Sequence, residues 1–216
     1  MTENALILFL KVPQRGVVKT RLASVLGDDL ALELYQSFLA DLSAMTHQVE
    51  AETIIVYTGP AGVSFSDFPG IPSLHQRGTT IGERMYCAFL DVFSQGFERC
   101  ALIGSDIPDL PATLVNDAFD KLRSVDVVLG PSTDGGYYLV GFQQHSLRQS
   151  IFNDIPWSTA SVFSETVKRI AESGLKAARL LRCSDIDELD DLKKFYEKNR
   201  HRAATSQVMK ILNDGE

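Results

Sequence analysis

The chain has 216 residues and a formal net charge of −7, with 44% hydrophobic and 23% charged residues. This length allows one large hydrophobic core, and the composition is that of an ordinary globular protein. The acidic balance argues against a general nucleic-acid or membrane binder, since these usually need a basic surface, and no apolar run approaches the length of a membrane span.

Strand-like and helix-like stretches alternate along the chain. Residues 5–10 form a continuous apolar run, typical of a strand buried on both faces, and apolar spacing predicts a helix over residues 28–47. Further strands are expected over residues 53–57, 73–75, 100–103, 126–129, 137–140 and 177–181. Further helices are expected after Thr80, which with Glu83 forms a capping box, over 111–123, after a capping Ser158, over 189–199 and in the tail 201–216.

This alternation predicts an α/β fold in which a mostly parallel sheet is covered by helices on both faces. No linker or repeat marks a domain boundary, so we expect a single domain over residues 1–216. Ligands in such folds bind beyond the carboxyl ends of the strands. The loops that follow strands 5–10, 100–103 and 177–181 are therefore the places to look for a site.

Three isolated cysteines, Cys87, Cys100 and Cys183, suggest reduced thiols and contain no metal-binding pair. The first four residues lack the basic start and long apolar stretch of a signal peptide. We therefore expect a cytoplasmic protein.

A basic segment over residues 11–21 directly follows the first predicted strand. Its cations are Lys11, Arg15, Lys19 and Arg21. Polyphosphates need cations together with inward-pointing backbone N–H groups, and a loop that contains Gly16 can supply both. The segment is not a Walker loop, because Val18 precedes the lysine and Pro13 replaces the first glycine of that motif. A solvated surface loop is the alternative.

Asp106 follows the apolar strand over residues 100–103, separated from it by a glycine and a serine. Mg²⁺ prefers oxygen ligands from one or two carboxylates, with phosphate oxygens and water completing the set. The alternative is that Asp106 caps the turn before the helix that begins near Pro111, although Asp109 is better placed for that role.

A second acidic segment spans residues 185–191, just after the last predicted strand. The preference of acids for a helix N-terminus explains Glu188, Asp190 and Asp191. It explains Asp185 and Asp187 less well, because these precede the helix. A second metal carboxylate there would face Asp106 across the end of the sheet.

Three further features allow both a functional and a structural interpretation. The turn Asp134-Gly135-Gly136 allows close approach to a ligand or simply a tight bend. The segment over residues 76–84 could hold a base or a second substrate anion, because Arg77 lies near a predicted helix N-terminus, which attracts anions, but a capped loop explains it equally. Trp157 could line a substrate site, although tryptophan is more often a packing residue.

Together these segments resemble the bacterial glycosyltransferase-like proteins of the GT-A superfamily described as selenodomain-associated. That family is related to the guanylyltransferases that make molybdenum-cofactor and phospholactate-derived cofactor precursors. The resemblance covers nearly the whole chain and depends on the order and spacing of residues 11–22, 76–78, 81–85, 105–108, 134–137, 157–159 and 185–192.

The resemblance implies a nucleotide-diphospho-sugar transferase (GT-A) fold, with a mixed, mainly parallel sheet and helices on both sides. It implies that Asp106 and Asp187 hold Mg²⁺ or Mn²⁺, although Glu188 stands where the family usually has threonine. It also points to Lys19 and Arg21 as phosphate ligands. The expected catalytic residues are therefore Asp106, Asp187 and Lys19. The expected nucleotide-binding residues are Lys11, Arg15, Gly16, Lys19, Thr20, Arg21 and Arg77, and the expected substrate-binding residues are Asp134, Gly135, Gly136 and Trp157.

Two enzyme functions fit these features. A sugar could move from a nucleotide-diphospho-sugar to an acceptor, as the family description favours. Alternatively, a nucleotidyl group could move from a triphosphate to a phosphorylated acceptor with release of pyrophosphate, which the cation-rich segment favours. A non-catalytic nucleotide-binding module is a third reading. The expected partners are a nucleotide or nucleotide sugar and a small-molecule acceptor, without nucleic acid or membrane, and a homodimer is allowed.

Overall fold

The computed structural model describes residues 3–202 and 206–214. The strands form one seven-stranded sheet in the order β3-β2-β1-β4-β6-β5-β7. Their bounds are β1 (Asn4–Lys11), β2 (Glu52–Thr58), β3 (Ser73–His75), β4 (Arg99–Ile103), β5 (Val127–Pro131), β6 (Tyr137–Gln143) and β7 (Ala177–Arg179). Only β6 runs antiparallel to its neighbours, β4 and β5. The predicted mixed, mainly parallel sheet is confirmed.

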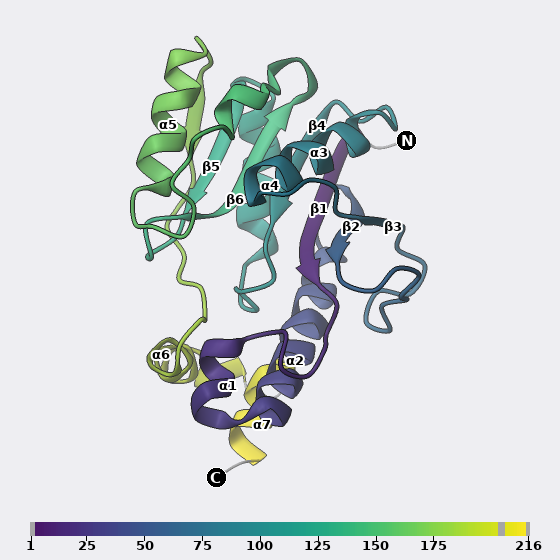
Figure 1. Ribbon diagram of the computed structural model, residues 1–216, viewed down its shortest axis with the longest axis vertical. Helices are drawn as coiled ribbons and strands as arrows, with labels where there is room; N and C mark the ends of the chain where they lie inside the picture. The colour runs from purple at the N-terminus through teal and green to yellow at the C-terminus, as the bar shows by residue number, and fades with distance from the viewer. Residues whose placement is uncertain (1–2, 203–205, 215–216) are drawn as a thin grey trace.

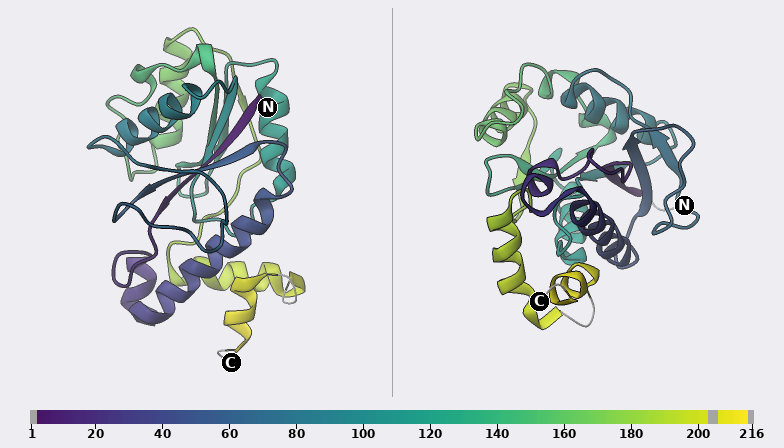
Figure 2. Two further views of the ribbon diagram at one scale, coloured as in Figure 1. Left: turned by 90° about the vertical axis from the view of Figure 1, so that its right-hand side faces the viewer. Right: turned by 60° about the horizontal axis from the view of Figure 1, so that its bottom comes forward.

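Helices cover both faces of this sheet (Figures 1 and 2). Their bounds are α1 (Thr20–Leu26), α2 (Asp28–Thr46), α3 (Ile81–Phe93), α4 (Ala112–Leu122), α5 (Val162–Glu172), α6 (Leu189–Asn199) and α7 (Gln207–Asp214). Helices α2 and α4 pack on one face, while α3 and α5 pack on the other. Within the described ranges, no helix combines the length and apolar character needed to cross a membrane.

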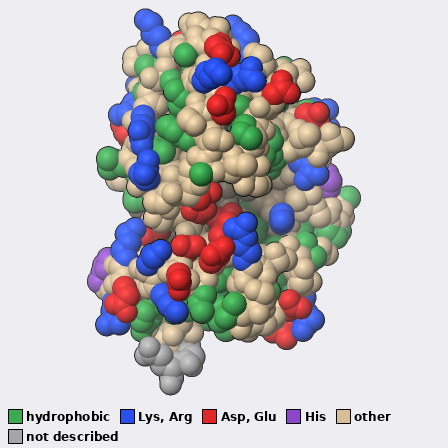
Figure 3. All heavy atoms as spheres, turned by 60° about the vertical axis from the view of Figure 1, so that its left-hand side comes forward, with side chains coloured by type: hydrophobic (Ala, Val, Ile, Leu, Met, Phe, Trp, Pro, Cys, Tyr) green, Lys and Arg blue, Asp and Glu red, His purple; other side chains and the backbone are tan. Residues whose placement is uncertain are grey.

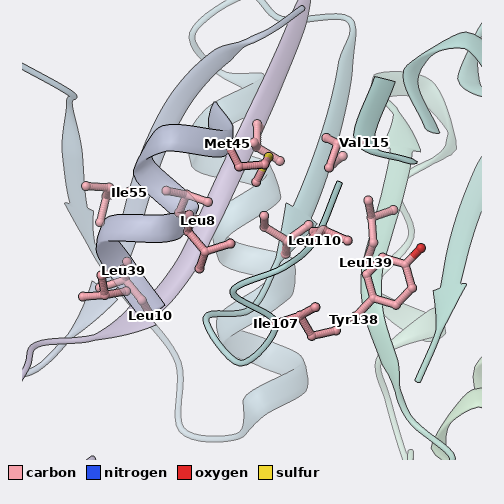
Figure 4. Close-up of a cluster of buried hydrophobic side chains, with 14 of the residues drawn as sticks. Leu8, Leu10, Leu39, Met45, Ile55, Ile107, Leu110, Val115, Tyr138 and Leu139 are labelled. Carbon is pink, nitrogen blue, oxygen red and sulfur yellow. The ribbon is translucent and has the colours of Figure 1, made fainter. Parts of the chain in front are cut away.

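The apolar run of β1 is explained by burial on both faces. Leu8 and Leu10 pack with the side chains of α2 and α4, while Ile7 contributes to the core beneath α3. Figure 4 shows the first of these cores, in which Leu8 and Leu10 of β1 lie near Leu39 of α2. Because side chains alternate across a strand, a strand covered on both faces has no polar positions in its middle.

A separate cluster of apolar side chains joins α1, α2, α6 and α7 beyond the carboxyl end of β1. Figure 1 shows these four helices gathered at the end of the molecule toward which the β1 arrow points. Phe38 of α2 and Ile186, which lies just before α6, are both buried in it. The segment before α6 is thereby fixed beside the loop that follows β1.

Most expected elements are present, but three local expectations are wrong. The basic segment ends in a short helix, α1, which begins at Thr20, so it is not a loop throughout. Ser158 does not cap α5; the helix starts at Val162 after Ser161, and Ser158 has a φ of 63°. Asp109 does not cap α4, where Pro111 holds the N-cap position. Asp109 instead accepts hydrogen bonds from Lys198 and Asn199.

Two other expectations about helices have clear outcomes. The capping box of Thr80 and Glu83 at the start of α3 is confirmed. The tail contains η3 (Arg200–Arg202) and the helix α7, while residues 203–205 and 215–216 of that expectation lie outside the described residues.

Asp41, a buried carboxylate in α2, holds the start of α7. It accepts hydrogen bonds from the Ser206 hydroxyl at 2.5 Å and from the backbone N–H groups of Gln207 and Val208 at 2.7 and 3.4 Å. Hydrogen bonds to a charged group contribute ~1.5–3 kcal/mol each, and unpaired donors add a penalty. We expect Asp41→Ala to lower the free energy of unfolding by about 2–4 kcal/mol and to increase hydrogen exchange in α7. The control Asp120→Ala removes an exposed carboxylate paired with Arg123 and should change little; equal stability of the two variants would refute this role for Asp41.

Candidate functional site

A cavity of about 400 Å³ crosses the carboxyl ends of β4, β1, β2 and β3. Its lining includes Lys11 at the end of β1, Asp106 after β4, Thr58 at the end of β2 and Gln76 after β3. Figure 3 shows one face of the molecule with a hollow around which acidic and basic side chains gather. We call the cavity that these residues line the first cavity. It lies where ligands bind in parallel α/β folds.

Lys19 is the central charged group of the first cavity. Its Nζ lies 2.5 Å from Asp106 Oδ1 and 3.4 Å from Asp187 Oδ1, and it donates a hydrogen bond to the Ile186 carbonyl oxygen at 2.6 Å. The Lys19 side chain is only 4% exposed, whereas those of Asp106 and Asp187 are 45% and 42% exposed. The two carboxylates that were predicted to bind a metal therefore lie close together, and both contact the ammonium group of Lys19.

The backbone at Lys19 has an unusual conformation that directs this side chain inward. Its φ of 47° and ψ of 43° lie in the left-handed region, immediately before α1. This region is disfavoured for residues other than glycine, so surrounding contacts must compensate for it. The Nζ lies 5.0 Å from the centroid of the Phe38 ring, in addition to its three oxygen contacts. The buried ammonium group of Lys19 therefore lies at the carboxyl ends of the strands.

Asp106 and Asp187 come from segments that bond to each other. The Ile186 N–H donates to the Asp106 carbonyl oxygen at 2.9 Å. Next in the chain, Glu188 and Asp191 form a capping box at the start of α6. The cap thus uses two of the three acids that the sequence assigns to the helix and leaves Asp187 facing the first cavity. Among the described residues, the Asp106 carboxylate has an ion pair with Lys19 and no helix-capping bond.

The donor set fits a divalent cation bound together with phosphates. Mg²⁺ and Mn²⁺ can use one or two carboxylates when phosphate oxygens and water complete the coordination. Within residues 3–202 and 206–214, no group of three or more His, Cys, Asp and Glu side chains could hold a metal by itself. Asp106 and Asp187 would therefore act as a pair, with a ligand supplying the rest.

Other cations also face the first cavity. Lys11, Arg21 and Arg84 line it, as does Thr20 in the first turn of α1. Arg21 is exposed, and its Nη1 lies 3.8 Å from Asp187 Oδ2. Unlike the buried Lys19, these side chains are at least partly exposed, so they can contact an anion in the cavity without breaking buried contacts.

Three residues of the predicted nucleotide-binding set lie outside the first cavity. Arg15 pairs with Asp28 and Asp29 on the surface. Its neighbour Gly16 is not among the lining residues and has a φ of 73° that suits a turn. Arg77 points away and pairs with Asp91 of α3.

A second cavity of about 230 Å³ adjoins the first, and Asp106, Gly104 and Ile81 line both. Two carboxylates, those of Asp134 and Asp185, face it in addition to Asp106. Aromatic walls are provided by Tyr137, Tyr138 and Trp157. Among the described residues that line this cavity, none is a lysine, arginine or histidine. The two cavities therefore differ sharply in charge and meet at Asp106.

Hydrogen bonds from nearby residues hold the two carboxylates Asp134 and Asp185 of the second cavity. Asp134 Oδ1 accepts a hydrogen bond from the Gly136 N–H at 2.8 Å, and Asp185 Oδ1 accepts one from the Ser132 hydroxyl at 2.8 Å. Burial raises the pKa of Asp185 above its ordinary value; the bond from Ser132 opposes this, and the negative charge of Asp134 adds to it.

Close packing fixes the aromatic and glycine-containing walls. A Cβ on Gly82 would lie 2.7 Å from the Phe152 carbonyl oxygen and 2.9 Å from Trp157 Cζ2. A Cβ on Gly135 would lie 2.3 Å from the Ala160 carbonyl oxygen, and Gly135 itself does not line the cavity. Trp157 also contacts Tyr137 edge-on, with ring centroids 6.4 Å apart. Gly135 is thus a packing position, whereas Asp134, Gly136 and Trp157 form the wall.

Sequence reasoning did not assign roles to several lining residues. Arg84 belongs to the segment over residues 76–84 that could hold a base or a second substrate anion, but it was not singled out there; its place four residues after the Thr80 cap of α3 was a usable signal. Tyr35 has no such signal, because it occupies a core position of α2. Its hydroxyl contacts Lys11 N and Ser105 Oγ at 3.1 and 3.2 Å, and burial raises the pKa of Tyr35 to about 12. It therefore acts as a neutral hydrogen-bonding bridge beneath the first cavity.

The sequence signature of a family described as "uncharacterized protein conserved in bacteria" (DUF2064) matches residues 41–159. The chain belongs to this family. It is also similar to a protein of Desulfovibrio desulfuricans G20 that is described provisionally as a nucleotide-diphospho-sugar transferase. The two sequences are 35% identical, and their structures superpose with a TM-score of 0.94 over 99% of this chain and 95% of that chain.

More distant structures share the fold. A CMP:2-keto-3-deoxy-manno-octonic acid synthetase complexed with CTP has 11% identity and a TM-score of 0.58 over 92% of this chain and 99% of that chain. Rv0371c of Mycobacterium tuberculosis H37Rv, in a complex with manganese, has 13% identity and a TM-score of 0.53 over 89% and 98%. No curated protein matches the sequence. The predicted family resemblance and GT-A-like fold are confirmed.

Trp157 is the only tryptophan of the chain, so its fluorescence reports on the second cavity. We expect Gly82→Ala to displace the indole ring, because the added Cβ would overlap Trp157 and the Phe152 carbonyl. The measurement is the tryptophan emission maximum and its quenching by iodide, both of which should change. The control Gly104→Ala adds a Cβ with no atom within 4 Å and should leave the emission unaltered. Identical emission from both variants and the parent would show that Gly82 does not position Trp157.

Proposed function

We propose that this protein is a metal-dependent transferase that moves a sugar from a nucleotide-diphospho-sugar to an acceptor. The first cavity would hold the nucleoside diphosphate, and the second would hold the sugar and the attacking acceptor group. The observation that carries this proposal is the contrast between the two cavities, which share Asp106.

The first cavity suits a diphosphate because several of its lining residues are cations. Lys11, Lys19, Arg21 and Arg84 can donate charge-assisted hydrogen bonds to phosphate oxygens. The paired carboxylates Asp106 and Asp187 would hold a divalent cation, which would supply further positive charge next to the phosphates.

The second cavity suits an uncharged, hydroxyl-rich group. Carboxylates such as Asp134 and Asp185 accept hydrogen bonds from sugar hydroxyls, and aromatic rings such as Trp157 offer an apolar face for the sugar ring. A phosphorylated acceptor would instead face like charges without a nearby counter-cation, which is costly. This contrast favours glycosyl transfer over nucleotidyl transfer to a phosphorylated acceptor.

The reaction would take place where the cavities meet. An acceptor hydroxyl attacks the anomeric carbon, the bond from that carbon to the phosphate oxygen breaks, and the nucleoside diphosphate leaves with the bonding electrons. A carboxylate of the second cavity, Asp134 or Asp185, would accept the proton of the hydroxyl. A bound Mg²⁺ or Mn²⁺ would neutralise the charge of the leaving diphosphate. Lys19 would turn from Asp106 and Asp187 toward the phosphates, and Arg21 would approach them from the solvent side. Positioned cations of this kind stabilise charge that develops in the transition state.

Two alternatives remain open to test. The cations of the first cavity could equally hold a triphosphate, which is the feature that favours a nucleotidyltransferase. A non-catalytic nucleotide-binding module would need the cations but has little use for the pair of carboxylates. Incubation with Mn²⁺ and a panel of nucleotide-diphospho-sugars should release nucleoside diphosphate. Release of pyrophosphate from triphosphates and sugar phosphates would favour the nucleotidyltransferase, and binding without any product would favour the module.

We expect Asp106→Asn to reduce turnover by at least ~10²-fold, the usual scale for loss of one preorganised electrostatic group. Stability should change little, because Asp106 is partly exposed, the asparagine oxygen can still accept a hydrogen bond from Lys19, and Asp187 and the Ile186 carbonyl oxygen continue to pair the ammonium. The measurement is nucleoside diphosphate release and melting temperature on the same preparation. The control Asp120→Asn alters an exposed carboxylate of α4 and should retain activity. A stable, fully active Asp106→Asn would remove the central carboxylate from the mechanism.

A further inference from the structure

The lining of the second cavity carries negative charge without a matching cation. Asp134 and Asp185 face this cavity, and Asp106 lines both cavities. Within residues 3–202 and 206–214, the lining of the second cavity includes no lysine, arginine or histidine. A divalent cation held at Asp106 would offset the charge of that carboxylate, but the charges of Asp134 and Asp185 would remain.

Neutral groups hold both of these carboxylates. The Gly136 N–H donates to Asp134 Oδ1 and the Ser132 hydroxyl donates to Asp185 Oδ1, each at 2.8 Å. A carboxylate can accept several hydrogen bonds, so both side chains can still accept from a ligand. A sugar hydroxyl could donate to them but would leave their charge uncompensated, whereas an ammonium group would donate and neutralise at once.

Two lysines of α6 lie beside Asp185 but belong to a different cavity. Lys194 and Lys198 line that cavity together with Asp185, and neither lines the second cavity. Lys194 Nζ lies 3.8 Å from Asp191 Oδ1, and Lys198 Nζ lies 2.8 Å from Asp109 Oδ2. Because both lysines already pair with other acids, a ligand can supply the positive charge that the second cavity lacks.

Aromatic rings form another part of the same wall, independently of the carboxylates. Tyr137, Tyr138 and Trp157 line the second cavity, and the rings of Tyr137 and Trp157 meet edge-on. The Tyr138 hydroxyl donates to the Leu181 carbonyl oxygen at 3.0 Å, which helps to hold this ring. The faces of aromatic rings attract cations. Carboxylates and aromatic rings that share one cavity therefore favour a ligand with an ammonium group.

We infer that the acceptor is a hydroxylated amine whose ammonium group binds in the second cavity to one of the carboxylates Asp134 and Asp185, beside the aromatic wall. This inference rests on the proposed function, in which the second cavity receives the sugar and the acceptor. The other carboxylate is then available to accept the proton of the attacking hydroxyl. The charge of this acceptor is opposite to that of the phosphorylated acceptor required for nucleotidyl transfer.

The test compares pairs of small molecules in which one hydroxyl is replaced by an ammonium group. The pairs are ethylene glycol with ethanolamine, glycerol with serinol, and glucose with glucosamine. Affinity is measured by calorimetry, and Trp157 fluorescence reports whether binding takes place in the second cavity. The parent protein should bind at least one amine about 10-fold more tightly than its neutral partner, the scale of a charge-assisted hydrogen bond. Equal affinities within every pair, or no binding of any amine, would overturn the inference.

The variants Asp134→Asn and Asp185→Asn each remove one charge and keep the size of the side chain. At least one of them should abolish the preference for the amine and leave the affinity for its neutral partner unchanged. The matched control Asp154→Asn removes the same charge from the loop that carries Trp157, at an exposed position that does not line the cavity, and should keep the full preference. An unchanged preference in both cavity variants, or an equal loss in Asp154→Asn, would refute binding at these carboxylates.

A second titration separates this inference from the proposed function. The parent protein is titrated with ADP-glucose, CDP-glucose, GDP-glucose and UDP-glucose in the presence of Mn²⁺, and amine binding is measured again on the complex that forms. The amine should still bind, because the donor supplies only the uncharged sugar. Displacement of the amine would place the ammonium site under the transferred sugar and overturn its assignment to the acceptor. If a donor binds but no amine does, the inference fails and the proposed function stands; if amines bind but no donor does, the proposed function fails.

Discussion

The ammonium group of Lys19 connects the three parts of the chain that form the site. It reaches from the segment after β1 to Asp106 after β4 and to Asp187 before α6, and these contacts span most of the sequence. A buried ammonium is unfavourable unless it is paired and hydrogen-bonded, and here two carboxylates and the Ile186 carbonyl oxygen satisfy it. The apolar cluster of α1, α2, α6 and α7 includes Ile186 and so holds the segment before α6 in position for this contact.

Two cavities meet beside this ion pair, and their lining residues differ in charge. On the side of β1, exposed cations such as Arg21 face the first cavity, whereas Asp134 and Asp185 face the second. Glycines at positions 82 and 135 allow the loop that carries Trp157 to pack directly against α3 and the turn after β5. The aromatic wall is therefore a consequence of backbone packing, and the same packing gives the second cavity a shape that does not depend on a bound ligand.

The sequence predicts the layered fold and the position of the site well, because the apolar run of β1 and the alternation of elements depend on local patterns. Asp106, Asp185 and Asp187 are identifiable because each follows a strand at the same edge of the sheet, and the family resemblance then selects Asp187 over Asp185. The resemblance singles out Lys19 and Arg21 from the other cations of the segment, but the sequence does not predict that Lys19 is buried and Arg21 exposed, because the left-handed backbone at Lys19 has no signature in the order of residues. The same limit applies to α5, which begins at Val162 and not after Ser158; near its start the Phe163 N–H donates to the Gly135 carbonyl oxygen at 2.9 Å, a contact distant in sequence. The bonds of Gln76 to Leu10 and Val56 join three strands and have no signature in the order of residues.

In the proposed reaction a divalent cation would take the position between Asp106 and Asp187 in which the Lys19 ammonium lies here. The most direct measurement is the Mn²⁺ affinity of the protein without nucleotide, determined by electron paramagnetic resonance for the parent and for Lys19→Met. Removal of a positive charge within 4 Å of both carboxylates should raise Mn²⁺ affinity at least ~10-fold, and Asp106→Asn in the same background should abolish the gain. Equal Mn²⁺ affinity of the parent and Lys19→Met would contradict the account.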